Sequence, residues 1–219
     1  STNIPPHNLG ELCRAIVHLL DNPDLSVEEL MVDVKGPDFP TGGLIYGKKD
    51  ILAAYSTGKG GITMRGRAEI IEGKNGFRIV ISEVPYQVNK ADLVEKIANL
   101  VKDKKLQGIK GLRDESDRDG VRVVIDLKKD AYPKKVLNAL YKHTPLQSVF
   151  HVNMLALIDG GIQPRILTLK MILEEYIKHR QEVIKRRTQY ELDKALERAH
   201  ILEGLMIALK NIDEVIKTI

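Results

Sequence analysis

Two runs of alternating apolar and polar residues flank an Asn-Gly dipeptide in the first half of the chain. The first run covers residues 62–71, the second covers 77–84, and the segment EGKNGF joins them. Alternation with a period of two is typical of a strand with one buried face, and Asn-Gly between two such runs predicts a tight hairpin. The polar face of the first run carries Thr63, Arg65, Arg67 and Glu69.

Helical periodicity predicts the elements around this hairpin. Asn8 with Glu11, and Ser26 with Glu29, have the spacing of reciprocal N-terminal caps, so a helix is expected after each pair. Further helices are expected over 49–55, 90–106 and 133–141, and further strands near 45 and over 121–127 and 148–158. The sequence therefore predicts an α+β fold, a mixed or antiparallel sheet with flanking helices, ending near residue 160.

The pattern changes from about residue 168 onward, where no proline occurs and Gly204 is the single glycine. Apolar residues follow three-four spacing there: Leu192, Ala195, Ala199, Leu202, Met206, Leu209, Ile212, Ile216 and Ile219. A helix of about fifty residues would be roughly 75 Å long, and its apolar stripe needs a partner helix. The pattern has not ended at Ile219. We therefore expect that this segment forms a very long coiled-coil helix, that the chain is a fragment of a larger protein, and that the returning partner helix lies beyond its end.

Composition limits the classes of function. Charged residues make up 29% of the 219 positions and the net charge is +4, which permits contact with nucleic acid without requiring it. Aromatic residues are 5% with no Trp, fewer than a protein that stacks single-stranded bases usually has. Cys13 is alone, which excludes a disulfide and a thiolate metal cluster, and its apolar neighbours predict a buried, unreactive thiol. Without a long apolar run or a leader peptide, we expect a cytoplasmic protein that does not enter a membrane.

The segment AYSTGKGGITMRGRAE resembles a nucleotide-binding loop at first sight. Counting back from Gly58 places Ala53 where a P-loop has its first glycine, and Gly60 stands where a P-loop has Ser or Thr. A helix is also expected before it, where a P-loop follows a strand. Lys59, Arg65 and Arg67 therefore have two open interpretations: a cationic edge that binds another kind of phosphate, or a solvated face.

Two other charged segments are candidates for chemistry. RDESDRDG (113–120) lacks the spacing of a calcium loop, so a turn with Asp and Ser bonding to the backbone is expected; the alternative is a magnesium site completed by a neighbouring chain. KHRQEVIKRR (178–187) can be solvated, paired with acids of another helix, or in contact with phosphates. The histidines have no metal-ligand spacing and no nucleophile has an evident base, so the residues predict neither a metal site nor a catalytic site.

Several long segments resemble one known family. They are TNIPPHNLGEL, GPDFPTGGLI, AYSTGKGGITMRGRAEI, EVPYQVNKADLVEKIA, LRDESDRDGVRVVIDLKKDA and RRTQYELDKALERAHILEGLMIALKNIDEVI. In this order and at these separations they resemble the A subunits of type IIA DNA topoisomerases. TNIPPHN and PYQVNKA are more similar to the DNA gyrase version than to that of topoisomerase IV.

The resemblance implies a domain organisation and a set of partners. Residues 1–35 would end the winged-helix part of the breakage-reunion core, 36–160 would form the α/β tower domain, and 161–219 would be the first arm of the coiled coil. The complete enzyme would change DNA topology by ATP-dependent double-strand breakage, passage and rejoining. Its partners would be double-stranded DNA, the gyrase B subunit and a second copy of the gyrase A subunit, with Mg²⁺ and ATP bound through the B subunit.

The resemblance also implies roles for residues of this chain. The active-site tyrosine of the family would lie upstream, so no catalytic residue is expected here and the chain alone is expected to be inactive. DNA phosphates would be contacted by Lys59, Arg65 and Arg67, with Lys48 and Lys49 as companions. The alternative function is a purely structural dimerisation module without DNA affinity of its own.

Overall fold

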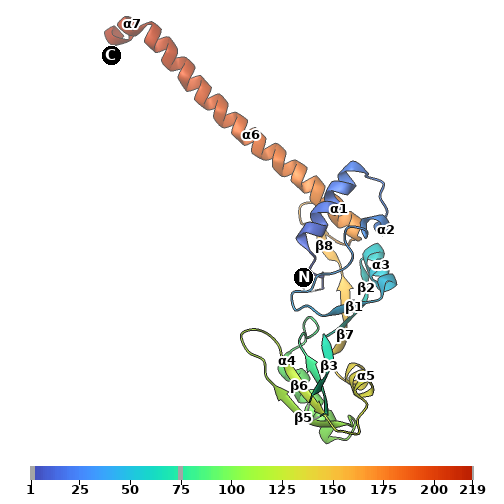
Figure 1. Ribbon diagram of the computed structural model, residues 1–219. Helices are drawn as coiled ribbons and strands as arrows, with labels where there is room; N and C mark the ends of the chain where they lie inside the picture. The colour runs from blue at the N-terminus through green and yellow to red at the C-terminus, as the bar shows by residue number, and fades with distance from the viewer. Residues whose placement is uncertain (1–2, 74–75, 219) are drawn as a thin grey trace. The chain divides into compact units, whose positions relative to one another are not determined.

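The structure is a computed structural model that describes residues 3–73 and 76–218 (Figure 1). The chain divides into two compact units, residues 1–171 and residues 172–219, and each is described by itself. The first unit has helices and antiparallel sheets, and the chain continues into one long helix, so the predicted α+β class is confirmed. None of the described helices combines the length and the apolar composition needed to cross a membrane.

Two capped helices open the first unit, α1 (Leu9–Asp21) and α2 (Val27–Leu30). Asn8 accepts a hydrogen bond from the backbone N–H of Glu11, and Ser26 and Glu29 form a reciprocal capping box. Both predicted helix starts are confirmed, because a cap depends only on residues three positions apart. The prediction of a buried Cys13 is wrong: it lies on the exposed side of α1.

A three-stranded antiparallel sheet follows, in the order β1–β2–β7. Its strands are β1 (Leu44–Tyr46), β2 (Lys59–Arg65) and β7 (Gln147–Asn153), and α3 (Lys48–Thr57) connects β1 to β2. β2 is the central strand and pairs with β7 over its whole length, from Lys59 opposite Asn153 to Arg65 opposite Gln147. The buried side chains of this region include Tyr55, Ile62, Met64, Phe150 and Val152.

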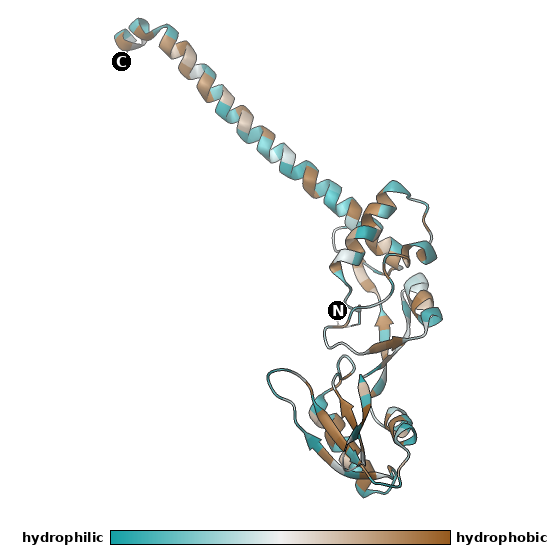
Figure 2. Ribbon diagram, viewed as in Figure 1, coloured by the Kyte–Doolittle hydropathy of each residue, from teal (hydrophilic) through white to brown (hydrophobic). Residues whose placement is uncertain are grey.

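A four-stranded antiparallel sheet forms a second lobe of the same unit, in the order β3–β4–β6–β5. Its elements are β3 (Ala68–Gly73), β4 (Gly76–Ile81), β5 (Ile109–Asp114) and β6 (Val123–Leu127), together with α4 (Lys90–Lys102) and α5 (Pro133–His143). The apolar strands appear brown in Figure 2, and they form one core with the two helices. Its fully buried members include Ile79, Ile81, Leu93, Ile97, Val123, Ile125 and Leu140.

The predicted strand over 62–71 is in fact two strands in two different sheets. β2 ends at Arg65, and β3 begins at Ala68 and pairs with β4. The break lies at Gly66, where a Cβ would come within 2.5 Å of the Glu83 carbonyl oxygen. The predicted hairpin with the second run is confirmed, although its Asn-Gly turn falls partly on residues 74–75, outside the described residues.

The sequence pattern missed two strands and merged two others into one. The run over 148–158 divides at Met154 into β7 and β8 (Leu155–Ile158), and β8 pairs with the unpredicted β9 (Gln163–Ile166). β5 was also missed, because IKGLRD lacks an apolar alternation and is recognisable as a strand only by its pairing with β6.

The long helix is α6 (Leu169–Lys210), 42 residues, followed after Asn211 by the short α7 (Ile212–Thr218). At 1.5 Å per residue α6 is about 63 Å long. Polar and apolar residues are interspersed along it in Figure 2. Many of its large apolar side chains are exposed: Leu192, Leu196, Ile201, Leu202, Leu205, Met206, Ile207 and Leu209. Ile219 of the predicted stripe lies outside the described residues.

Candidate functional site

Three of the five predicted cations lie at the two ends of α3. Lys48 and Lys49 are its first residues, directly after Gly47, and Lys59 follows Gly58, which ends the helix. All three side chains are exposed, and none forms an ion pair within the described part of the chain. We call Lys48, Lys49 and Lys59 the α3 lysines.

The glycines of this segment hold α3 tightly against its neighbours. Gly58 has a φ of 74°, and a Cβ there would come within 2.6 Å of Ile166 Cγ2. A Cβ on Gly60 would lie 2.9 Å from the Cβ of Ala54. The Gly58 N–H donates to the Ala54 carbonyl, and the Gly58 carbonyl accepts from the Met154 N–H at 2.8 Å. These backbone groups already form hydrogen bonds within the fold, so they are not available to bind a phosphate. The glycines instead allow close packing, which fixes the backbone at Lys59.

Arg65 has a different environment from the α3 lysines. Its guanidinium lies 4.5 Å from the ring centre of Tyr46 and 4.8 Å from that of Tyr141, and Nε donates to Gln147 Oε1 at 2.5 Å. We call this arrangement the Arg65 bracket. Guanidinium groups are attracted to aromatic faces, by about 0.5–1 kcal/mol at exposed sites and more where water is excluded. The bracket joins β1, β2 and β7 to α5, so Arg65 acts first as a structural connection.

Tyr141 also connects the Arg65 bracket to Gly66, where the chain passes from β2 to β3. The Tyr141 hydroxyl donates to the Gly66 carbonyl at 3.2 Å, and the Gly66 N–H donates to the Leu146 carbonyl at 2.8 Å. Burial raises the pKa of Tyr141, as does Tyr46, while Arg65 opposes the shift. The hydroxyl therefore stays protonated and available as a donor at neutral pH.

Arg67 lies beyond the break and is tied to an acid. Its Nε is 3.5 Å from Glu83 Oε1, and Glu83 also accepts a hydrogen bond from the Gly43 N–H. The Arg67 side chain is 52% exposed, so this pair is solvated and weak. Arg67 is held by this one weak pair, whereas Arg65 lies between two aromatic rings.

The structure therefore places the five predicted cations in three environments: the ends of α3, the Arg65 bracket, and the exposed pair of Arg67 with Glu83. The prediction that Arg65 and Arg67 share one strand face with Thr63 is wrong, since the chain changes sheet at Gly66. Lys48 and Lys49 lie at one end of α3 and Lys59 at the other. The roles of Tyr46, Tyr141 and Gln147 were not predicted, because their relation to Arg65 depends on residues far apart in the chain and no local pattern marks them.

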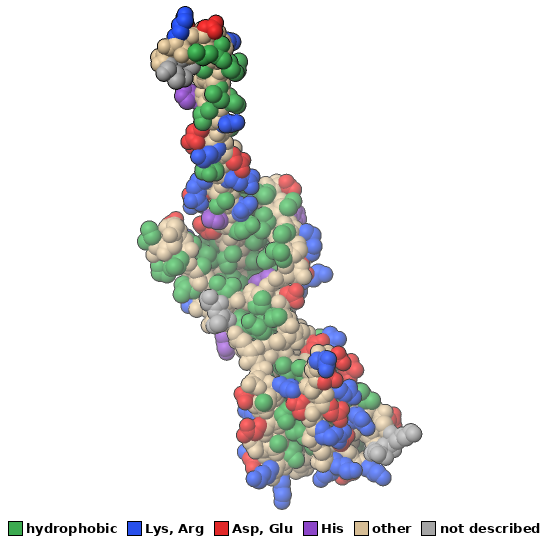
Figure 3. Space-filling view, turned by 90° about the vertical axis from the view of Figure 1, so that its left-hand side faces the viewer, with side chains coloured by type: hydrophobic (Ala, Val, Ile, Leu, Met, Phe, Trp, Pro, Cys, Tyr) green, Lys and Arg blue, Asp and Glu red, His purple; other side chains and the backbone are tan. Residues whose placement is uncertain are grey.

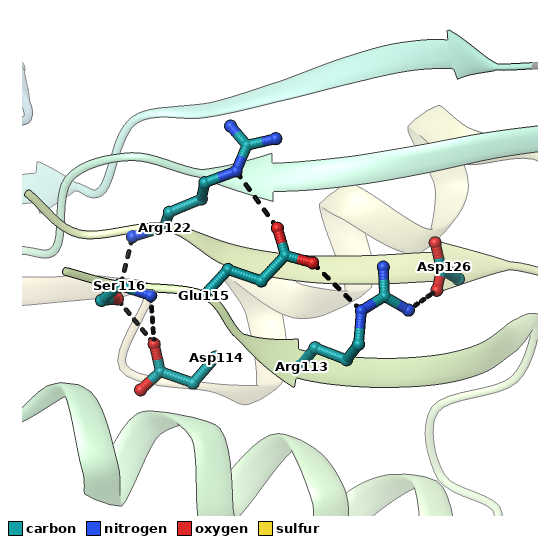
Figure 4. A network of polar contacts seen from close by, with 6 residues as sticks. All are labelled: Arg113, Asp114, Glu115, Ser116, Arg122 and Asp126. Carbon is teal, nitrogen blue, oxygen red and sulfur yellow. Dashed lines mark hydrogen bonds and ion pairs between the residues drawn. The ribbon is translucent and has the colours of Figure 1, made fainter.

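The acidic segment 113–120 takes part in a network of polar contacts on the β5–β6 hairpin (Figure 4). Arg113 binds both Glu115 and Asp126, and Arg122 also binds Glu115. Asp114 accepts hydrogen bonds from the N–H and hydroxyl of Ser116 and lies 2.7 Å from Lys90 Nζ.

This arrangement confirms the predicted turn with Asp and Ser bonding to the backbone. The pKa of Asp114 is lowered to about 2, mainly by the hydrogen bond from Lys90 and then by those from Ser116. Among the described residues no three His, Cys, Asp or Glu side chains are placed to hold a metal ion.

Comparison with known proteins gives the family. A sequence model that describes the A subunits of DNA gyrase and topoisomerase IV matches residues 1–219. The DNA gyrase A subunit of Clostridium acetobutylicum is 59% identical over all of this chain and 26% of its own length. The DNA gyrase A subunit of Staphylococcus aureus (strain MRSA252) is 58% identical over all of this chain and 25% of its own length. The chain thus spans about a quarter of the length of these relatives, and it belongs to the family of DNA gyrase and topoisomerase IV A subunits.

Proposed function

We propose that this chain is a DNA-gripping and bracing region of a gyrase-type A subunit, with residues 36–160 as its tower domain. The complete enzyme would change DNA topology by ATP-dependent double-strand breakage, passage and rejoining, in the cytoplasm. The observation that carries the proposal is the contrast between the exposed, unpaired α3 lysines and the rigid segment on which they lie. A lysine on a backbone that is already ordered can contact a duplex phosphate with only its side chain to be ordered, and this lowers the entropy cost of binding.

The α3 lysines supply sequence-independent contacts in this proposal. Each lysine that neutralises a phosphate releases condensed counterions, so affinity depends steeply on salt. Arg67 is a secondary contact that exchanges Glu83 for a phosphate. The main contribution of Arg65 in this proposal is to hold β1, β2, β7 and α5 together and so to position the surface; its own contact with DNA stays a prediction.

The chemistry of strand breakage is assigned outside this chain. We assign no catalytic residue to it and expect it to be inactive alone. The described residues do not gather a set of ligands that fits Mg²⁺, and we assign this ion, with ATP, to the gyrase B subunit. The identities to two gyrase proteins favour gyrase over topoisomerase IV as the parent.

A second candidate function is a structural module that dimerises and has no DNA affinity of its own. The exposed apolar residues of α6 favour it, since Leu202 is 44% and Leu209 is 68% exposed and such side chains normally find a cover. The two functions differ in one measurable property, because a scaffold shows no salt-dependent binding of duplex DNA.

The test is fluorescence anisotropy with a duplex of about thirty base pairs over a salt series. We expect Lys48→Gln/Lys49→Gln/Lys59→Gln to lower the slope of log K against log salt by about two to three units. The matched control is Lys35→Gln/Lys96→Gln/Lys210→Gln, which removes the same charge from exposed positions elsewhere. Equal slopes for the two triple variants would reject the α3 lysines as the grip, and no binding by the wild type at low salt would favour the scaffold.

A further inference from the structure

A cavity of about 620 Å³ lies in the four-stranded lobe, away from the α3 lysines. It opens between the segment that follows α4 and the loop that connects β6 to α5. Its volume is within the range of small-molecule sites, about 300–1,000 Å³. Six of the residues that line it are apolar, and we call them the floor: Val101, Leu106, Ile109, Ala131, Val136 and Ala139.

The wall of this cavity is cationic. Lys104, Lys105, Lys128 and Lys135 line it, against one acid, Asp130. Lys105 has a loose contact with Asp103 at 3.8 Å, and the other three lysines form no ion pair within the described residues. Figure 3 shows Lys and Arg side chains gathered along the lower edge of this lobe. We call the four residues and the cavity the lysine pocket.

The two helix ends beside the pocket differ in how well they accept positive charge. Lys104 and Lys105 follow the C-terminus of α4, where the helix dipole favours positive charge, so the fold alone accounts for them. Lys134 and Lys135 lie in the first turn of α5, where the dipole disfavours positive charge, and this turn has no acidic residue. Tyr132, the N-cap of α5, provides no side-chain hydrogen bond to the helix N-terminus. Pro133 has no N–H, and the N–H groups of Lys135 and Val136 already donate to the Tyr132 carbonyl. The lysines are therefore the main groups that an anion in the pocket would satisfy.

The floor of the pocket is rigid. Gly108 has a φ of 85°, and a Cβ there would lie 2.9 Å from the Cβ of Ala131. The Lys128 N–H donates to the Gly108 carbonyl at 2.8 Å, which fixes the β6 end of the pocket to its opposite wall. Tyr132 stands at the rim, 77% exposed, and offers an aromatic face. A pocket with an apolar floor and an aromatic rim suits a ligand that carries an apolar or aromatic body as well as negative charge.

We propose that the lysine pocket binds a small phosphate ester with an aromatic body, of the nucleotide class, through Lys128 and Lys135 beside the first turn of α5. The phosphates lie among the lysines and the body covers the apolar floor beside Tyr132. This site is independent of the proposed DNA grip, since the two share no residue.

The test uses ADP and inorganic pyrophosphate as probes of similar charge, with and without an aromatic body. Isothermal titration calorimetry on the wild-type chain is expected to give about tenfold tighter binding for ADP. Amide chemical-shift changes are expected at Gly108, Ala131 and Lys134 on ADP addition, and not in α3. Equal affinity for the two probes would overturn the role of the floor, and no shift changes at millimolar ADP would overturn the site.

Variants separate binding from folding. Lys128→Gln/Lys135→Gln is expected to weaken ADP binding by about tenfold or more, whereas the control Lys35→Gln/Lys96→Gln leaves it unchanged. Lys104 has a φ of 58°, a conformation that glycine adopts more easily, so Lys104→Gly is expected to raise the Tm while ADP binds more weakly. A Lys104→Gly variant that binds ADP as tightly as the wild type would remove Lys104 from the site. The pocket would be ordinary cationic surface if short duplex DNA displaced ADP and if Lys128→Gln/Lys135→Gln and Lys35→Gln/Lys96→Gln weakened ADP binding equally.

Discussion

The Arg65 bracket and the α3 lysines both adjoin the three-stranded sheet but differ in how their charges are surrounded. Arg65 has two aromatic faces and an amide oxygen around it, so its guanidinium is held in place by contacts within the fold. The α3 lysines have no ion-pair partner within the described residues. Residue type alone therefore does not identify a cation that is available to a ligand, because its availability depends on its neighbours in space.

The largest effect is expected where the two sheets meet. Gly66→Ala would place a Cβ 2.5 Å from the Glu83 carbonyl oxygen and 2.7 Å from Leu146 Cδ1. We expect the free energy of unfolding to fall by about 2–3 kcal/mol, the usual cost of overpacking, as measured by urea denaturation. Gly111→Ala is the control, since its nearest neighbour would be Asp126 at 3.5 Å and its effect should stay within about 0.5 kcal/mol. Equal losses for both variants would mean that the junction is not specially packed.

A smaller effect is expected within the bracket. Arg65→Ala removes both aromatic contacts and leaves Gln147 without its donor, so we expect a loss of about 2 kcal/mol in the free energy of unfolding. Arg67→Ala breaks an exposed pair only and should change it by less than about 0.5 kcal/mol. If the two variants are equally stable by urea denaturation, Arg65 does not brace the sheet and the contrast with the α3 lysines fails.

The smallest effect concerns the β5–β6 hairpin in acid. The folded pKa of Asp114 is about 2, below its ordinary value of 3.8, so its stabilising contribution is complete above about pH 4. That contribution is lost as the pH falls from about 4 to 2, because the unfolded chain takes up the proton first. The stability of wild type should therefore fall more than that of Asp114→Asn across this interval, measured by urea denaturation at each pH. Parallel pH profiles would show that Lys90 and Ser116 do not stabilise the carboxylate.

The accuracy of the sequence predictions depended on the distance along the chain over which each feature is determined. The caps at Asn8 and Ser26 were predicted correctly, since each needs a partner three residues away. The hairpin after residue 68 was also predicted, because its two strands are adjacent in the chain. The long helix was predicted for the same reason, since its periodicity repeats locally.

The site was predicted less well, because it depends on contacts between distant segments. Arg65 and Arg67 look equivalent in the alternating pattern, and the difference between them comes from Tyr46, Tyr141 and Glu83. The segment with Gly58 and Gly60 resembles a nucleotide-binding loop at first sight, whereas the structure uses these glycines, and Gly66, for close approach of other segments. The assignment of the lysines to DNA stays a prediction.

The pairing of β2 has a mechanical consequence. β2 is the middle strand of its sheet, and seven consecutive residues, from Lys59 to Arg65, are in register with β7. A load applied at Lys59 along the strand acts on the hydrogen bonds of this ladder together, as shear, and does not open them one after another. Beyond Arg65 the same chain enters the four-stranded sheet within three residues, so the tension passes into a second shear-loaded sheet without a compliant loop between them.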